Sequence, residues 1–401
     1  MTGNHQKTLV HVTTIPETLV FLQGQISFMK ERGFAVHVVS SPGPMLEKVG
    51  HREGVPVHGV SMERRISPLA DVRSICSLFF LFRKLRPTLL HAHTPKGGLL
   101  GVLAGRMTGA KSVVYTLHGL RYATAKGWRR KLLQSAEAMT CGLADRVFAV
   151  SLANQRQAVA DGICPEGRIR LLARGSCNGV DSLGRFNPEK LKPSLRAETR
   201  RKFRIPDSGV VLGYVGRIVR DKGITELWEA WCSLKDQNPE IYLLIVGPIE
   251  EQDPLPCSVM ARLTADERVR MVGWADDPVP FYAAMDVFVL PTYREGFPIS
   301  PLEAAAMELP VIASRVDGCV EAVADGMTGL LVPPRDSKAL AEALQRLILK
   351  PELRERMGRA GRQRVLSDFR PEVIWEELYQ SYLDLLKVRG VEPRAREGVP
   401  H

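Results

Sequence analysis

Short runs of valine, leucine and isoleucine recur along this 401-residue chain and alternate with longer amphipathic segments. The apolar runs lie at residues 9–12, 36–40, 89–93, 113–117 and 147–150, and again at 210–215, 241–246, 269–272, 287–290, 311–313 and 330–332. Strands that are apolar at nearly every position are typical of parallel sheets covered by helices on both faces. Between the two series, prolines and charged residues dominate positions 184–206, which indicates a linker. We therefore expect an α/β chain of two doubly wound parallel-sheet domains, at 1–195 and 206–370.

Two motifs follow strands of the second series, GRIVRDKG at 216–223 and REGFPISPLEA at 294–304. Arg217 and Lys222 can both reach a diphosphate from a turn at a strand end, one as a planar fork and one as a point charge. Glu295 and Glu303 lie eight residues apart across a Gly-Pro loop, and each carboxylate can accept two hydroxyl hydrogen bonds. The first turn of the helix that begins between them offers unpaired N–H groups to phosphate. A nucleotide sugar matches this arrangement, with hydroxyls at both ends and a diphosphate between them.

The combination G-R-x4-K-G followed by E-G-F-P-x4-E resembles the donor site of retaining glycosyltransferases with the GT-B fold, specifically family 4. Segments 93–101, 115–119 and 178–181 resemble the bacterial branch that builds capsule, O-antigen or lipid-linked glycans. The resemblance implies two Rossmann-like domains that face a cleft, with the nucleotide sugar bound by the second domain. It also implies a C-terminal helix at 371–390 that crosses back to the N-terminal domain. Little beyond residue 390 could pack, so we expect a disordered tail there.

The same resemblance assigns roles to individual residues. Arg217 and Lys222 would bind the donor diphosphate and stabilise the charge that develops on it as the sugar leaves. Glu303 would bind the ribose hydroxyls, whereas Glu295 would approach the donor hexose and His118 would contact the donor sugar. The candidate catalytic residues are thus Arg217, Lys222, Glu295 and His118. The other candidate donor-binding residues are Gly24 in the first strand-to-helix connection, Gly216, Gly296, Phe297, Pro298 and Ile299.

The family also implies a mechanism and a pair of substrates. A hexose-type sugar would move from UDP to a hydroxyl on a lipid-linked glycan by front-face substitution, in which the departing phosphate oxygen takes the acceptor proton. This mechanism requires no strong protein nucleophile, and the chain shows no obvious carboxylate nucleophile motif.

His91, His93 and His118 raise the alternative of a metal-dependent hydrolase, because a His-x-His pattern at a strand end places both imidazoles on one face. Such an enzyme needs an acidic residue or a further histidine at later strand ends, where a serine, a glycine and a proline stand instead. No D-x-D pair lies near an apolar strand either. We therefore expect no metal and no cofactor, with the nucleotide sugar as cosubstrate.

Positive charge is concentrated in the first half of the chain. Residues 1–195 hold 27 lysines and arginines against 12 acidic residues, whereas the remainder holds 28 against 32. Such a one-sided basic domain suggests an anionic partner, either a membrane surface or nucleic acid. Residues 121–131 interleave aromatic rings with cations, a composition suited to anionic lipid headgroups. Segment 78–86 is a second membrane candidate, which core packing explains at least as well. The candidate acceptor and membrane contacts are Lys96, Tyr122, Lys126, Trp128, Arg129, Arg130 and Lys131.

Other features bear on location. No apolar run approaches the roughly 18 residues that span a bilayer, and the N-terminus lacks the pattern of an export signal. The seven cysteines include no CxxC pair, which indicates free thiols. We expect a cytoplasmic protein held peripherally at the cytoplasmic face of the inner membrane by an anionic lipid surface.

Three alternatives remain open. A GT-B enzyme could use a soluble acceptor, or could epimerise or phosphorolyse its sugar. A basic nucleic-acid-binding protein is the third, but the chain has none of the familiar reader motifs, so nucleic acid is not an expected partner.

Overall fold

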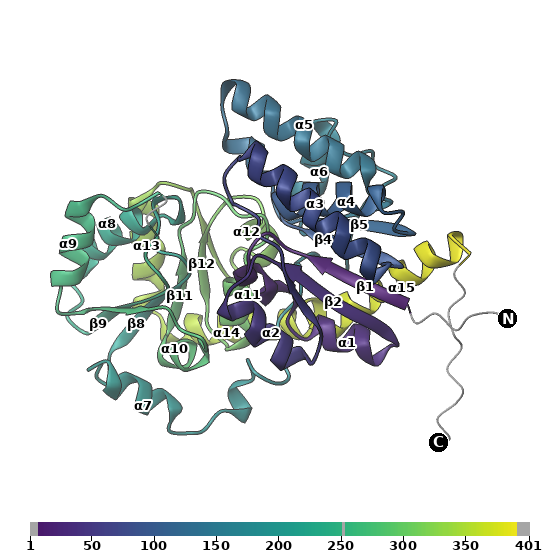
Figure 1. The fold of residues 1–401 in the computed structure, drawn as a ribbon. Coiled ribbons are helices and arrows are strands. Elements are labelled where there is room, and N and C mark those ends of the chain that lie inside the picture. The colour runs from purple at the N-terminus through teal and green to yellow at the C-terminus, as the bar shows by residue number, and fades with distance from the viewer. Residues whose placement is uncertain (1–6, 251–252, 391–401) are drawn as a thin grey trace, which may run out of the picture. The chain divides into compact units, whose positions relative to one another are not determined.

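The chain folds into two α/β units in a computed structural model that describes residues 7–250 and 253–390 (Figure 1). Unit 1 joins the residues up to Asn178 with those from Pro371 onward, and unit 2 runs from Gly179 to Arg370. The C-terminal helix α15 (Pro371–Val388) therefore belongs to unit 1. Residues 1–6, where an export signal would begin, lie outside the described residues. The tail beyond residue 390, which was expected to be disordered, also lies outside them.

Unit 1 is built on a parallel sheet with the strand order β3-β2-β1-β4-β5-β6-β7. Its strands are β1 (Lys7–Val12), β2 (Phe34–Ser40), β3 (Val57–Gly59), β4 (Leu89–His93), β5 (Ser112–Leu117), β6 (Arg146–Ala149) and β7 (Ile169–Leu171). The sequence predicted all of these except β3 and β7. Both have three residues and include a polar side chain, so the apolar pattern did not distinguish them from loops.

Different helices cover the two faces of this sheet, because successive side chains of a strand point to opposite sides. Val10 and Val12 of β1 share one buried cluster with Phe82 of α3, whereas Leu9 shares another with Leu378 of α15. The helices of unit 1, besides α15, are η1 (Pro16–Leu22), α1 (Gln25–Glu31), α2 (Pro44–Glu53), α3 (Pro68–Leu85), α4 (Pro95–Met107), η2 (Arg121–Thr124), α5 (Gly127–Leu143) and α6 (Leu152–Ala160).

Unit 2 repeats this plan around a second parallel sheet with the order β10-β9-β8-β11-β12-β13. Its strands are β8 (Val210–Val215), β9 (Ile241–Val246), β10 (Val269–Gly273), β11 (Val287–Leu290), β12 (Val311–Ser314) and β13 (Gly329–Val332), all predicted from the sequence. Its helices are η3 (Pro188–Lys190), α7 (Leu195–Lys202), η4 (Arg220–Lys222), α8 (Ile224–Leu234), α9 (Cys257–Ala265), α10 (Val279–Ala284), α11 (Ser300–Ala306), α12 (Cys319–Ala322), α13 (Ser337–Ile348) and α14 (Pro351–Asp368).

The segment 184–206 is part of unit 2 rather than a linker, and the first segment of unit 1 ends at Asn178 rather than at residue 195. Arg200 in this segment is 1% exposed, and its guanidinium donates to Asp286 Oδ2 at 2.7 Å and to the carbonyl oxygen of Gly209 at 2.9 Å. A buried charge of this kind is tolerated because it is paired and hydrogen-bonded. The high charge of the segment therefore concealed helix α7, which is anchored to the body of unit 2.

Each sheet has one point where the strand order reverses. In unit 1 this switch lies between β1 and β4, and in unit 2 it lies between β8 and β11. Open α/β sheets bind ligands outside the carboxyl ends of the strands at such a switch. We therefore expect ligand-binding residues at the carboxyl ends of the strands that flank these two switch points.

Candidate active site

The two motifs of unit 2 lie together at its switch point, because one follows β8 and the other follows β11. The backbone N–H of Tyr293 donates to the carbonyl oxygen of Asp221 at 2.8 Å, and Arg294 forms an ion pair with the Asp221 carboxylate at 3.0 Å. Gly223 has φ of 70°, and a Cβ there would collide with the carbonyl oxygen of Pro291. Only glycine allows the two loops to approach this closely.

Lys222 and Glu295, assigned to different parts of the ligand, form a direct ion pair from Lys222 Nζ to Glu295 Oε1. The two side chains are only 13% and 18% exposed. A half-buried pair of this kind is screened less than a surface pair, so each charge fixes the orientation of the other. The sequence predicted that both residues belong to the site but not that they contact each other.

Arg217 is paired in the same way with a residue that the sequence analysis missed. Its Nη1 lies 2.8 Å from Glu250 Oε2, and the Arg217 side chain is 44% exposed. Glu250 follows β9, the neighbour of β8 in the sheet, so its approach to Arg217 depends on strand order. The available clue was a carboxylate shortly after an apolar strand.

Glu303 lies on α11 and is held by Tyr282 of α10. The buried Tyr282 hydroxyl donates to Glu303 Oε2 at 2.8 Å, and burial raises the pKa of the Glu303 carboxyl above its ordinary value. Glu303 Oε1 makes no hydrogen bond within the described parts of the chain. One oxygen is thus fixed while the other can accept a ligand hydroxyl. Tyr282 was not predicted, because no motif contains it.

The loop between the two glutamates combines buried and accessible positions. Phe297 and Pro298 are buried, and Phe297 packs against Phe369 with ring centroids 5.7 Å apart. Their side chains therefore stabilise the loop, whereas Gly296 and Ile299 are half-buried. Gly216 directly follows β8. Helix α11 has only seven residues, and Pro301 offers no N–H, so its first turn presents fewer amide donors to an anion than expected.

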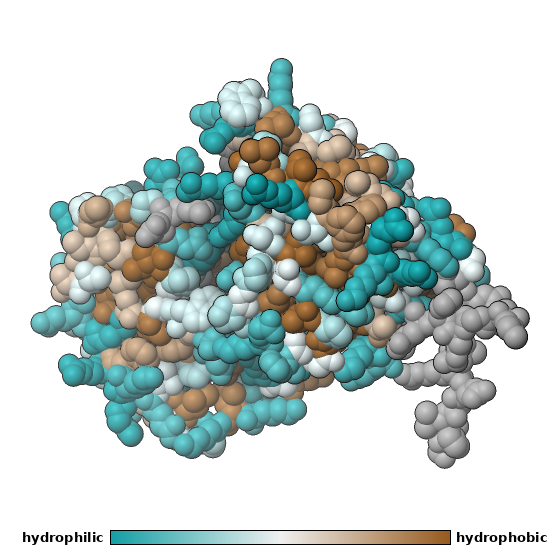
Figure 2. All heavy atoms as spheres, in the orientation of Figure 1, coloured by the Kyte–Doolittle hydropathy of each residue, from teal (hydrophilic) through white to brown (hydrophobic). Residues whose placement is uncertain are grey.

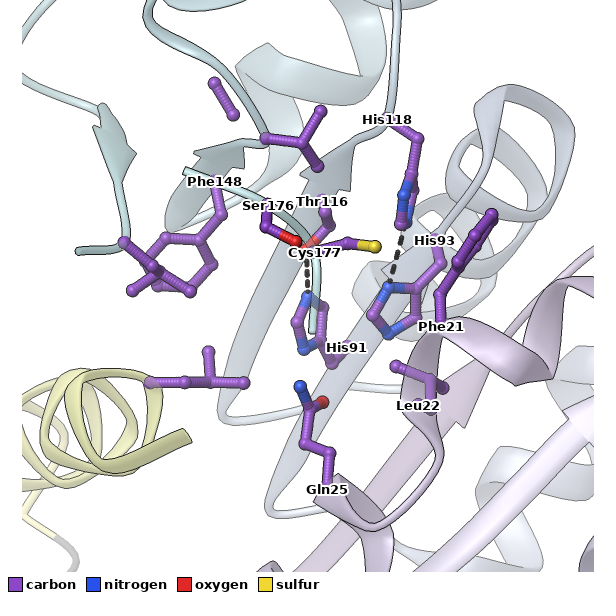
Figure 3. A pocket seen from close by; sticks show the side chains of 14 residues that line it. Phe21, Leu22, Gln25, His91, His93, Thr116, His118, Phe148, Ser176 and Cys177 are labelled. Atoms are coloured by element: carbon purple, nitrogen blue, oxygen red, sulfur yellow. Dashed lines mark hydrogen bonds between the residues drawn. The ribbon is translucent and has the colours of Figure 1, made fainter. Parts of the chain in front are cut away.

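A narrow pocket lies in unit 1 at the carboxyl ends of its central strands, with room for about one water molecule (Figure 3). His91 and His93 of β4 and His118 after β5 line it together with Phe21. The Phe21 ring stacks on His118 with centroids 5.4 Å apart. The structure thus brings together all three histidines that the sequence singled out.

These histidines are linked to His11 of β1, which the sequence analysis overlooked. His11 Nδ1 lies 3.1 Å from His93 Nε2, and His93 Nδ1 lies 3.4 Å from His118 Nε2. His91 is separately held at both ring nitrogens, by the Tyr382 hydroxyl and by Thr116 Oγ1 at 2.7 Å. Burial lowers the pKa of all four imidazoles, to about 3 for His11 and about 4 for His118. The signal that could have revealed His11 was a histidine inside an apolar strand.

Ligand atoms of His11, His91 and His93 lie within 4.8 Å of one another, a spacing that a metal ion could use. Among the described residues, however, every ring nitrogen of these three side chains except His11 Nε2 already has a hydrogen-bond partner. The arrangement is therefore better suited to a hydrogen-bonded chain than to a metal centre.

Two further predicted positions have structural partners. Gly24 precedes α1 with φ of 76°, and a Cβ there would lie 2.6 Å from the Trp375 ring, so packing within unit 1 already requires glycine. Lys96 Nζ donates to Asp71 Oδ1 at 2.7 Å, and the Lys96 side chain is only 13% exposed. An acceptor phosphate would have to compete with Asp71 for this lysine.

Tyr122 is 1% exposed, so the prediction that its ring contacts a membrane is wrong. The ring fills the core beneath α5, because a tyrosine buries a large apolar body there. Trp128, in contrast, is 71% exposed at the start of α5, and its neighbours Lys126, Arg129, Arg130 and Lys131 are exposed as expected.

Helices α3 and α5, which both pack on α4, together present an apolar and basic surface that we call the α3–α5 face. Figure 2 shows hydrophobic residues gathered over this region and bordered by hydrophilic ones. Its exposed hydrophobic members are Leu69, Val72, Phe80, Trp128, Leu132 and Met139. Among the described residues, no helix combines the length and the apolar character needed to cross a bilayer.

Comparison with known proteins yields matches over nearly the whole chain. The family model described as glycosyl transferases group 1 matches residues 196–364, and the model of a glycosyl transferase 4-like domain matches residues 20–175. The capsular polysaccharide biosynthesis glycosyltransferase CapM of Staphylococcus aureus is 34% identical over 379 residues, which cover 94% of this chain and 97% of that protein.

Two further proteins are similar over most of their length, the second of them in fold alone. The UDP-Gal:alpha-D-GlcNAc-diphosphoundecaprenol alpha-1,3-galactosyltransferase of Escherichia coli is 26% identical, with 80% of this chain and 82% of that protein covered. The crystal structure of Anabaena Alr3699/HepE in complex with UDP and glucose superposes with a TM-score of 0.77 at 20% identity, covering 94% of this chain and 99% of the other.

Proposed function

Because the chain belongs to the GT-B glycosyltransferases of the group 1 and family 4 type, as its motifs predicted, we propose a specific reaction for it. It moves a hexose-type sugar from a UDP-sugar to a lipid-linked glycan with retention of configuration. The observation that carries this proposal is the position of Arg217, Lys222 and Glu295 beyond the ends of β8 and β11, at the switch point of the sheet.

The cations at this point act on the leaving diphosphate. In the structure Lys222 and Arg217 each form an ion pair with a carboxylate. When the diphosphate binds, its oxygens replace these carboxylates as the partners of the two cations. The bond between the anomeric carbon and the departing phosphate oxygen breaks, and the acceptor oxygen bonds to the same face of that carbon. The acceptor proton passes to the departing oxygen, whose charge the two cations stabilise. We propose that these cations take the place of a metal ion.

The two carboxylates bind the two sugar parts of the donor. Glu303, oriented by Tyr282, accepts the ribose hydroxyls through Oε1. Glu295 and His118 contact the hexose. The donor base is proposed as uracil, supported by the UDP named for the Escherichia coli relative and for the Anabaena structure.

The acceptor is proposed to be held at a membrane. The α3–α5 face combines exposed hydrophobic side chains with cations, and such surfaces bind anionic lipid with roughly 1 kcal/mol per basic residue. The Escherichia coli relative is named for a GlcNAc-diphosphoundecaprenol acceptor, which supports a lipid-linked glycan, and the Staphylococcus aureus relative is named for capsular polysaccharide biosynthesis. We therefore propose peripheral attachment to the cytoplasmic face of the inner membrane.

A thermal-shift series with UDP, GDP, ADP and CDP tests the donor. A nucleotide at 100 times its dissociation constant stabilises the protein by about 2.7 kcal/mol, and only UDP should produce such a shift. A Lys222→Ala variant serves as the control, because it should lose most of the effect. Equal shifts from all four nucleotides, or none from UDP, would remove the UDP assignment.

Flotation with anionic liposomes at low and high salt tests the membrane proposal. Wild type should float at low salt and less at high salt, because screening removes the electrostatic part of the attraction. An Arg129→Glu, Arg130→Glu, Lys131→Glu variant should stay at the bottom, and Trp128→Ala should float only partly. If wild type and the triple variant behave alike, a soluble acceptor becomes the better assignment.

A further inference from the structure

Three imidazoles form a line of hydrogen bonds from the interior of unit 1 to its pocket. His11 on β1 contacts His93 on β4 at 3.1 Å, and His93 contacts His118 after β5 at 3.4 Å (Figure 3 shows the second contact). His11 and His93 are 0% and 3% exposed. His11 and His93 lie on the neighbouring strands β1 and β4, and His118 directly follows the next strand, β5, so the sheet fixes the line.

The protonation state of the line is constrained by its burial. Burial lowers the pKa of His118 to about 4 and that of His93 well below its ordinary value, so the rings are neutral at physiological pH. A neutral imidazole carries one N–H and one lone pair. Each contact needs one proton, and therefore both N–H groups must point the same way along the line.

The two possible directions differ in what they leave at the buried end. His11 Nε2 has no hydrogen-bond partner within the described residues. If the protons point toward His11, this atom is a buried N–H without an acceptor, which costs about 1–3 kcal/mol. If the N–H groups point toward His118, His11 Nε2 carries only a lone pair, and a buried acceptor without a partner costs less than a buried N–H without one. The second direction is therefore favoured.

We propose that His93 and His11 are positioning residues that hold His118 as its Nδ1–H tautomer, so that His118 offers a hydrogen-bond donor to an oxygen of the bound sugar. His118 Nε2 accepts from His93 Nδ1–H, and His93 Nε2 accepts from His11 Nδ1–H. Phe21 stacked on the His118 ring keeps the ring from rotating out of this line. Only the identity of the ligand rests on the proposed function; the tautomer does not.

Nuclear magnetic resonance of protein labelled with ¹⁵N-histidine tests the tautomer directly. The His118 signals, assigned by their loss in His118→Ala, should show Nδ1 protonated and Nε2 bare. In His93→Asn the amide lies near the former Nδ1 and can still donate, so the tautomer should persist. In His93→Gln the amide reaches toward His11 instead, and His118 should revert to the Nε2–H form that an unconstrained imidazole prefers. An Nε2–H form in wild type, or no difference between the two variants, overturns the proposal.

A second pair of variants acts one residue further away and does not alter His93. His11→Asn keeps a donor near the Nδ1 position and should preserve the tautomer, whereas His11→Leu should release it. This pair decides the matter if the His93 variants do not fold. A tautomer unaffected by His11→Leu would again overturn the proposal.

Kinetics connects the tautomer to catalysis. His93→Gln should lower turnover roughly 10- to 100-fold, as expected for a weakened transition-state donor, while UDP binding by calorimetry stays unchanged. His93→Asn should remain near wild type. If the spectra show the Nδ1–H form but no UDP-sugar is turned over, the proposed function fails and the histidine line stands. If sugar transfer is normal and His118 is Nε2–H, the histidine line fails and the proposed function stands.

Discussion

Glu137 on α5 should make unit 1 less stable as the pH rises from about 4.5 to 7. This carboxyl is 5% exposed and accepts a hydrogen bond from the Tyr115 hydroxyl at 2.6 Å. Burial raises the pKa of Glu137 from 4.5 to about 7, although the Tyr115 hydrogen bond and the charge of Arg121 oppose the shift. The carboxyl therefore stays protonated in the folded state at pH values where the unfolded chain has lost the proton.

The sign and size of the effect follow from proton linkage. Between pH 4.5 and 7 the folded state binds more protons than the unfolded state, so the free energy of unfolding falls as the pH rises. The contribution is fully present below pH 4.5 and is lost above pH 7. At about 1.4 kcal/mol per pH unit, the loss amounts to about 3 kcal/mol.

The Glu137→Gln variant isolates the contribution of Glu137 ionisation to the free energy of unfolding, because glutamine keeps the acceptor for Tyr115 but cannot ionise. Urea unfolding of wild type and variant at a series of pH values, fitted identically, should give free energies that diverge by about 2.5 kcal/mol in favour of glutamine between about pH 5 and pH 8. All other titrating groups cancel in the difference. Glu63→Gln, at an exposed loop position, is the matched control and should show no such divergence. A difference between wild type and Glu137→Gln that does not change with pH would refute the reasoning.

Three further outcomes test the candidate active site. Lys222→Ala or Arg217→Ala should reduce turnover roughly 100- to 1000-fold, as for the loss of one oxyanion donor, and wild-type rates would remove these residues from the mechanism. In calorimetry, Glu303→Ala should weaken UDP itself, whereas Glu295→Gln should spare UDP and weaken the UDP-sugar; equal losses for both ligands would contradict the division of roles. Activity should survive EDTA, because Arg217 and Lys222 neutralise the diphosphate, and loss that Mg²⁺ or Mn²⁺ restores would overturn the metal-free assignment.

The apolar runs predicted the architecture well because a strand buried on both faces leaves a clear local pattern. The runs at 210–215 and 287–290 coincide with β8 and β11, and helix α15 (Pro371–Val388) ends two residues before the expected bound of 390. The pattern failed where burial does not require apolar residues. Arg200 is buried because carbonyl oxygens and Asp286 surround it, and this could not be read from its charged neighbours.

The site was predicted only in part for a related reason. Lys222 and Glu295 belong to motifs and were found, but their contact depends on β8 lying beside β11. Glu250, Tyr282 and His11 belong to no motif, and each acts through a partner at least 20 residues away in sequence. Such partners become visible only when strand order is known. The burial of Tyr122 is of the same kind, since nothing local distinguishes it from an interfacial aromatic.

The two-segment construction of unit 1 has a consequence for synthesis on the ribosome. Leu378 and Tyr382 complete a core that begins with Leu9, yet the 192 residues from Gly179 to Arg370 are made in between. At roughly 5–20 residues per second, this interval lasts roughly 10–40 s. Unit 2, encoded without interruption, can finish folding while the older part of the chain still exposes an apolar face to solvent. The first unit to emerge is therefore the last to be complete, and during translation it is the part of the nascent chain most in need of a chaperone.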